Sequence, residues 1–204
     1  MKLGKTISAC ALTAVVCTSV TAVAMRQDGE PSMEEMMEKW AEMTAPDEHH
    51  EHMKKMAGTW QVDMKMWMYP GADAMESTAV STMESILDGR YIMEHMDGEM
   101  DWGAGPMPFH GLNLVGYDTF KEKWMYCWVD NNTTGLMIGE GTESPDGKTV
   151  TYWSEGPDPM TGKMKKMKST MTHINDNEVL FRMYDKTPDG TEFVTMEGAY
   201  KRKH

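Results

Sequence analysis

The sequence predicts a mainly β protein, a single antiparallel up-and-down β-barrel of about ten strands preceded by a short helical extension. From residue 59 onward, apolar and polar residues alternate with a period of two, which is typical of half-buried strands. Turn signals separate these segments: Asp-Gly at 88–89, 97–98, 146–147 and 189–190, and Asn175-Asp176-Asn177. Short connections favour antiparallel neighbours, and closing such a meander removes its exposed edges.

Residues 1–24 have the pattern of a secretory signal peptide. Two lysines lie near the start, an uncharged run of apolar and small residues follows, and Ala22-Val23-Ala24 is an A-x-A cleavage signal. We therefore expect cleavage before Met25. The mature protein would then be periplasmic or extracellular, with no membrane insertion.

Cleavage would change the charge and the cysteine count. The formal net charge of -12 would become -14, because Lys2 and Lys5 contribute two positive charges. Loss of Cys10 and Cys17 would leave Cys127 with no cysteine for an internal disulfide. A lipid anchor on Cys10 or Cys17 is the alternative, although neither lies in a complete lipobox.

The net charge and the sequence motifs argue against several classes of function. A net charge of -12 disfavours nucleic acid as a partner, because neutralising phosphates requires a basic face. The sequence has no Gly-x-Ser-x-Gly and no phosphate-binding loop. We expect neither an enzyme nor a cofactor, and the oligomeric state stays open.

Residues 25–46 form an N-terminal extension with an amphipathic helix. Ser32 and Glu35 have the spacing of a capping box, in which each side chain bonds the backbone N–H of the other residue. An apolar stripe follows at helical spacing and consists of Met33, Met36, Met37, Trp40 and Met43. We expect this stripe to pack on the main domain, and insertion into a groove of a partner protein is the alternative.

Residues 47–204 form the barrel domain, which begins with a short helix. Asp47 is a good N-cap for this helix, and Gly58 ends it. The first strand lies within 59–70, with one face made of Trp60, Val62, Met64, Met66 and Met68. We expect the other strands at 75–87, 90–97, 109–118, 123–130, 134–142, 149–155, 164–174, 178–185 and 192–202.

The hairpin around Asp88-Gly89 supplies candidate ligand-binding residues. A two-residue turn would pair Leu87 with Arg90 and direct inward a face made of Ala79, Ser81, Met83, Ser85, Leu87, Arg90, Ile92, Glu94 and Met96. Small residues on this face would leave room for a cavity. Its two charged residues, Arg90 and Glu94, would each need a partner or a polar ligand if they are buried. We predict ligand contacts from Ser81, Met83, Ser85, Arg90, Glu94 and His110. An ion pair of Arg90 with Glu94 near the rim is the alternative.

Histidines that accompany methionines raise two further possibilities. His110 and His173 each share a predicted face with apolar residues and could enter the barrel, as a haem ligand would, but no haem-attachment motif is present. In the short helix, His49, His52 and Met53 are spaced so that they could bind one copper or zinc ion. The chain contains 25 methionines, and those in the strands follow the period of core positions, which favours packing.

Several segments, taken in order, resemble a bacterial family, domain of unknown function 1579, which is lipocalin-like. They are Pro46 to His50, Met53, Met56, Gly58 to Trp60, Trp67, Leu87 to Tyr91, Pro108 to Gly111, Gly116 to Asp118, Trp128, Asp130, Asp158 to Lys163 and Tyr200 to Arg202. The resemblance runs from near residue 33 to the end and implies a barrel, but no reaction or ligand. In lipocalins the Gly-x-Trp of the first strand packs against a C-terminal Arg, which implies that Trp60 stacks with Arg202 at the barrel floor.

We therefore predict an exported, lipocalin-like binding protein for a small, mainly apolar molecule held in the barrel. This prediction depends in part on fold analogy, because one fold can serve many functions. Two alternatives remain open. One is a periplasmic copper- or zinc-buffering protein that uses His and Met, and the other is a structural or interaction module without a ligand.

Overall fold

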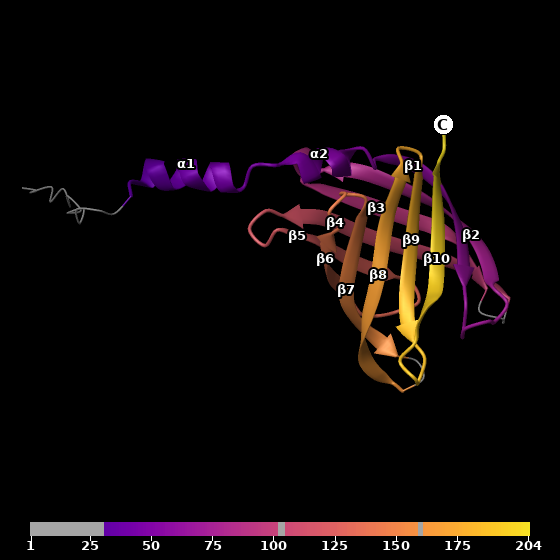
Figure 1. Cartoon of the computed structure of the whole chain (residues 1–204). Coiled ribbons are helices and arrows are strands. Elements are labelled where there is room, and N and C mark those ends of the chain that lie inside the picture. The colour runs from indigo at the N-terminus through magenta and orange to yellow at the C-terminus, as the bar shows by residue number, and fades with distance from the viewer. Residues whose placement is uncertain (1–30, 102–104, 159–160) are drawn as a thin grey trace, which may run out of the picture.

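The structure is a computed structural model that describes residues 31–101, 105–158 and 161–204. The predicted signal peptide lies outside these residues. Ten antiparallel strands form a closed barrel, in which each strand pairs with its neighbour in sequence and β1 pairs with β10 (Figure 1). The predicted fold class is confirmed. The strands are β1 (Gly58–Met66), β2 (Met75–Ile86), β3 (Tyr91–Asp101), β4 (Pro106–Asp118), β5 (Lys123–Asp130), β6 (Met137–Glu143), β7 (Thr149–Asp158), β8 (Lys163–Asn175), β9 (Glu178–Lys186) and β10 (Glu192–Arg202).

Within the described residues, two short α-helices precede the barrel. Helix α1 (Met33–Met43) begins at Ser32 with the predicted capping box, and α2 (Glu48–Lys54) begins at Asp47, whose side chain accepts a hydrogen bond from the His49 backbone. Within the described residues, no helix is long and apolar enough to cross a membrane.

The β2–β3 hairpin has the predicted register but a longer turn. Met83 pairs with Glu94 and Ser85 with Ile92, as a turn centred on Asp88-Gly89 requires. The ladder stops at Ile86, however, and the 3-10 turn η1 (Leu87–Gly89) follows. Leu87 is 66% exposed, so its predicted inward orientation is wrong. The two strands stop pairing at Ile86, so Leu87 lies in the turn and does not point into the barrel.

The inward face of β1 is the one that the alternation predicts. Trp60, Val62, Met64 and Met66 are buried, with exposed fractions of 1%, 0%, 6% and 3%. Met68 lies beyond the strand and is 69% exposed. This face joins inward residues of the other strands in one core.

Aromatic rings lie over glycines on the inner wall. A Cβ atom at Gly111 would lie 2.4 Å from the Trp128 ring, and one at Gly139 would lie 2.2 Å from the Tyr126 ring. Glycine is needed here because a larger residue would displace the ring. The rings of β5 therefore fill much of the interior beside β4 and β6.

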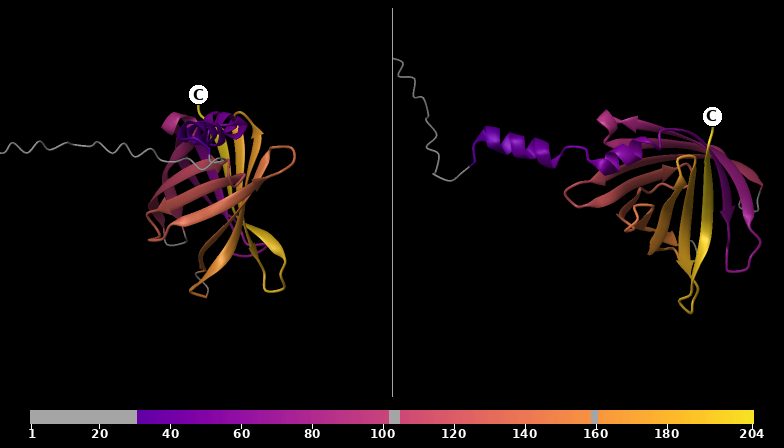
Figure 2. Two further views of the ribbon diagram at one scale, coloured as in Figure 1. Left: turned by 90° about the vertical axis from the view of Figure 1, so that its left-hand side faces the viewer. Right: turned by 45° about the horizontal axis from the view of Figure 1, so that its top comes forward.

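The apolar stripe of α1 does not pack on the barrel, so this prediction is wrong. Its members are all exposed, from 42% at Met43 to 70% at Met33. Only the last turn makes contact: the Thr119 hydroxyl donates to the Met43 carbonyl at 3.0 Å, and the Trp40 ring lies 5.8 Å from that of Phe120. The rest of the helix projects away from the wall (Figures 1 and 2).

Met64 provides a test of the inward face of β1. We expect Met64→Ala to lower the free energy of unfolding by about 2–5 kcal/mol, because it leaves a cavity, and Met64→Leu to cost under about 1.5 kcal/mol. Urea unfolding measures both. The exposed control Met68→Ala should stay within about 0.5 kcal/mol of the wild type. If Met64→Ala unfolds like the wild type, this face does not form the core.

Candidate functional site

Helix α2 lies across one end of the barrel, called the closed end below (Figure 1). His50 and Met53 are its buried residues. The Nδ1 atom of His50 lies 2.8 Å from the Asp47 carboxylate and 3.1 Å from the Asp47 backbone nitrogen. This pair holds the first turn of α2 together while Met53 enters the core.

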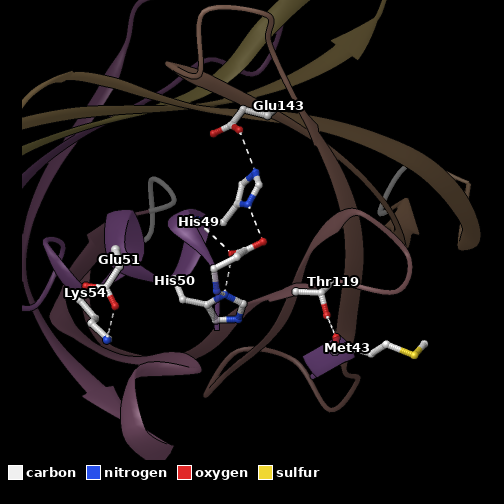
Figure 3. Close-up of polar contacts among 8 residues, drawn as sticks. Met43, His49, His50, Glu51, Lys54, Thr119 and Glu143 are labelled. Atoms are coloured by element: carbon white, nitrogen blue, oxygen red, sulfur yellow. Dashed lines mark hydrogen bonds and ion pairs between the residues drawn. The ribbon is translucent and has the colours of Figure 1, made fainter. Parts of the chain in front are cut away.

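His49 connects α2 to the barrel wall. Its ring stacks on Tyr117 of β4, with centroids 3.8 Å apart and an interplanar angle of 7°. Its Nε2 atom lies 3.5 Å from a Glu143 carboxylate oxygen of β6, and its Nδ1 atom lies 3.0 Å from Asp47 (Figure 3). His49 therefore ties the helix to two strands.

His52 contacts a different strand. Its ring meets that of His173 on β8 edge to face, with centroids 4.5 Å apart. The Nε2 atom of His52 is buried and has no hydrogen-bond partner among the described residues. Burial, and then the nearby His52, lower the pKa of His173 to about 4. His173 is therefore neutral at pH 7.

Arg202 joins the end of β10 to α2. The structure places its guanidinium carbon 4.1 Å from the centroid of the Trp60 ring, so the two residues stack as the family resemblance implies. The guanidinium also donates to the backbone carbonyls of Lys55, Ala57 and Asp176, at 2.6, 2.8 and 3.0 Å. One side chain thus binds the helix, the first strand and the β8–β9 turn.

A buried carboxylate lies inside the barrel. Glu94 of β3 is 3% exposed. The hydroxyls of Ser81 and Tyr200 donate to its Oε1 atom at 2.7 and 3.3 Å, and the amide of Asn113 donates to its Oε2 atom at 3.2 Å. We call these four residues the Glu94 cluster. They come from β2, β3, β4 and β10, so only the closed barrel assembles them.

The Glu94 cluster holds an ionisable carboxyl group with no opposite charge beside it. Burial raises the pKa of the Glu94 carboxyl, and the hydrogen bonds from Ser81, Asn113 and Tyr200 oppose that rise. All three donors are neutral, and no ion pair joins Glu94 to a described Lys, Arg or His. A buried charge without a counter-charge costs free energy, which a polar ligand group can offset.

Other polar groups face the same interior. The Oδ1 atom of Asn113 and the Nε1 atom of Trp124 are buried, and neither has a hydrogen-bond partner among the described residues. One accepts and the other donates, so a bound molecule with a donor and an acceptor could satisfy both. Tyr126 is already hydrogen-bonded to Ser154 and Ser169.

The structure brings three of the six predicted ligand-binding residues together in the interior. Ser81 and Met83 are buried on β2, next to Glu94. Ser85 is exposed near the end of β2, and Arg90 caps the turn η1. Ser85 pairs with Ile92 and so shares the face of Met83, but it lies at the exposed end of the ladder. Arg90 lies outside the ladder, and no ion pair between Arg90 and Glu94 is found in the described chain.

The predicted phase of β4 is also wrong. His110 points outward, where its Nδ1 atom lies 2.6 Å from Asp97 on the outer wall. The inward residues are Phe109, Gly111, Asn113, Val115 and Tyr117. Leu112 and Leu114, the apolar pair that suggested the opposite phase, face outward. The sequence analysis therefore missed Asn113. Phe109 is 5% exposed and lies four residues earlier on the same face of β4, so choosing Phe109 as the inward residue would have placed Asn113 inward as well.

The predicted set of metal ligands on α2 does not converge on one point. His49 reaches Tyr117 and Glu143, His52 reaches His173, and Met53 is buried in the core. Across the described residues, no three His, Cys, Asp or Glu side chains form a group that could hold a metal ion. Methionine sulfur is a separate kind of ligand and is not among these four residue types.

The end of the barrel opposite α2, called the open end, carries no helix in the described parts of the chain (Figure 1). Several inward side chains nearer to this end are half-buried, namely Trp128, Met137, Met167, Met183 and Met196, whereas Met66 and Met100 are buried. The interior is therefore less enclosed at this end along β5 to β10 than along β1 and β3. A separate groove of about 870 Å³ runs over β1–β3 and has an acidic lining that includes Asp63, Glu76 and Glu99. Glu94 does not line it.

The chain thus belongs to the class of closed ten-stranded antiparallel barrels, with a helix across one end and polar groups inside. Residues 45–202 match the family described as "Protein of unknown function (DUF1579)", and the chain is a member of that family, as the sequence motifs predict. No curated protein matches the chain.

Solved structures with a similar fold include Rv2717c from M. tuberculosis, with 10% sequence identity, a TM-score of 0.55, and coverage of 78% of this chain and 100% of that chain. A redesigned β-barrel matches with 17% identity, a TM-score of 0.37, and coverage of 74% and 93%. A de novo fluorescence-activating β-barrel matches with 13% identity, a TM-score of 0.41, and coverage of 74% and 96%. At this identity the likeness to Rv2717c shows the fold alone.

Arg202 should be essential for the stability of the closed end. We expect Arg202→Lys to lower the free energy of unfolding by about 2–4 kcal/mol, because the ammonium cannot reproduce the three-way fork of hydrogen bonds over Trp60. Chemical denaturation measures the loss. The control Lys201→Gln removes an exposed pair with Asp63 and should cost under about 1 kcal/mol. Equal effects of the two changes would contradict this role of Arg202.

The neutral His173 should make stability depend on pH. The pKa of His173 is about 4 in the folded protein and 6.5 when unperturbed, so its contribution is present above pH 6.5 and is lost as pH falls towards 4. The loss is at most about 3 kcal/mol. Unfolding measured from pH 7.5 to 4.5 should therefore show a smaller loss for His173→Gln, while the control His95→Gln, exposed on β3, should follow the wild type. Identical slopes for wild type and His173→Gln would refute this assignment.

Proposed function

We propose that this protein is an exported, lipocalin-like binding protein that holds a small, mainly apolar molecule in its barrel. The proposed role is binding, not catalysis. The observation that carries it is the Glu94 carboxylate, which is 3% exposed and hydrogen-bonded only to neutral donors. Such a group favours a ligand that brings a hydrogen-bond donor or a positive charge into the barrel.

The rest of the interior sets the character of the ligand. The walls around the Glu94 cluster are apolar and aromatic, with Met83, Met96, Trp124 and Trp128 among them. An apolar body with one or two polar groups would fit, because apolar lining supplies affinity and a few polar groups supply orientation. Asn113 Oδ1 and Trp124 Nε1 are further candidates for polar ligand contacts.

The two ends of the barrel suggest the route of entry. Helix α2 is tied at the closed end by His49, His52 and Arg202, whereas several inward residues of β5 to β10 near the open end are half-buried. We infer that the ligand enters through the open end and that the closed end stays rigid. Export is supported by the pattern of residues 1–24 and remains part of the proposal.

Native mass spectrometry of protein purified from its own cells tests the proposal. We expect a chain that begins at Met25 and carries a retained small molecule. A chain that still begins at Met1 would contradict export. A bare mass, together with no saturable uptake of the neutral apolar amine N-phenyl-1-naphthylamine, would favour a filled barrel without a ligand.

Glu94 provides the residue-level test. We expect Glu94→Gln to weaken N-phenyl-1-naphthylamine binding by about 1–2 kcal/mol, because a charge-assisted hydrogen bond contributes about twice as much as a neutral one. Fluorescence titration measures this. The control Asp63→Asn removes a carboxylate from the outer wall and should bind like the wild type. Unchanged binding by a folded Glu94→Gln protein would place the ligand elsewhere.

A further inference from the structure

Four methionines form a continuous row on the inner wall of the barrel. Met75 of β2 pairs with Met66 of β1, Met66 pairs with Met196 of β10, and Met196 pairs with Met183 of β9. Directly paired residues point to the same face of a sheet, so the four side chains lie beside one another at one level of the barrel. We call this row the methionine ladder.

A β-bulge brings Met196 into the ladder. The β9–β10 register shifts between Val194 and Met196, so the extra residue is Thr195. The Thr195 carbonyl accepts a hydrogen bond from Trp67 N–H at 2.9 Å, which fixes the bulge to the β1–β2 connection. Without the shift, Thr195 would lie opposite Met183. Bulges commonly re-aim a side chain next to a functional site, and here the change exchanges a hydroxyl for a thioether.

The ladder lies apart from the Glu94 cluster. Trp60 is level with Ser81 of that cluster, whereas Met66 lies six residues further along β1, roughly 20 Å towards the open end. Met66 is 3% exposed, while Met75, Met183 and Met196 are half-buried. A fifth sulfur is close by. The Sδ atom of Met64 lies over Gly198, which is two residues along β10 from Met196 towards the closed end. The row is therefore both enclosed and reachable from the open end.

Packing alone does not require four methionines in this row. Val and Ile fill inward strand positions with better strand propensity, whereas Met has a flexible, unbranched side chain and a thioether sulfur that can act as a soft metal ligand. Thioether ligands select monovalent copper over harder ions. The formal net charge of -12 further favours approach of a cation.

We propose that the methionine ladder is a binding site for a soft monovalent metal ion, namely Cu(I). At least three neighbouring thioethers, those of Met66, Met196 and either Met75 or Met183, supply the ligands. The ion enters through the open end. This site shares no residue with the Glu94 cluster and does not depend on the histidines of α2.

Silver(I), a redox-stable stand-in for Cu(I), tests the site in the full-length mature protein with ¹³C-labelled methionine methyl groups. We expect saturable binding of a single ion, with methyl shifts concentrated on Met66, Met75, Met183, Met196 and Met64. A competition titration with Cu(I) and a chromophoric chelator should show the same stoichiometry. Shifts that spread evenly over the exposed methionines, or no saturable binding, would overturn the proposal.

Conservative variants separate coordination from packing. Bound silver should raise the melting temperature of the wild type by mass action. The double change Met66→Leu/Met196→Leu conserves volume, so the apo protein should melt close to the wild type. The same change should abolish the rise in melting temperature that silver causes. The control Met83→Leu/Met96→Leu changes inward methionines outside the ladder and should retain the rise. Glu94→Gln should also retain it, which keeps this test independent of the ligand proposal. If silver still raises the melting temperature of the folded Met66→Leu/Met196→Leu protein, the ladder is not the site. If that double variant does not fold, the single variant Met196→Leu is tested in its place, and a persistent rise in its melting temperature would refute the ladder in the same way.

Discussion

Pairing of the first strand with the last is the constraint on which the rest of this structure depends. β1 forms ladders with both β2 and β10, and the β1–β10 seam ends where Trp60 lies opposite Arg202. Closing a chain segment of this length costs entropy, which the seam recovers only through many contacts formed together. Arg202 then extends the seam to α2 by hydrogen bonds to Lys55 and Ala57. The closed end is therefore a consequence of barrel closure.

The same seam creates both interior sites. Tyr200 reaches Glu94 across 106 positions of sequence because β10 returns beside β1. Met196 meets Met66 for the same reason, at the other end of the seam. The interior thus combines a carboxyl group with hard oxygen atoms near the closed end and a row of soft sulfur atoms near the open end. A low-polarity interior strengthens the interactions of both kinds of group with a suitable ligand and penalises ionisation of the carboxyl group when no partner is present.

The outer wall has an unusual distribution of apolar residues. Met93, Leu114, Cys127 and Ile138 are direct cross-strand neighbours on the outer face of β3 to β6. The inner face of the same region contains Gly111, Asn113 and Gly139 instead. Leu112 and Leu114 therefore indicate the wrong face of β4, because the Trp128 ring of β5 occupies the space over Gly111 on the inner face.

The sequence by itself determined the barrel, its ten strands, the β2–β3 register and the inward face of β1. These features follow from local signals, since a period of two and a turn dipeptide act within a few residues. Tertiary structure alone decided the phase of β4, the length of the turn before Arg90, the exposure of α1 and the separation of His49 from His52. It also decided which residues surround Glu94 and that Thr195 bulges so that Met196 faces Met66. Each of these depends on a neighbour distant in sequence, and a pattern read along one strand carries no information about that neighbour.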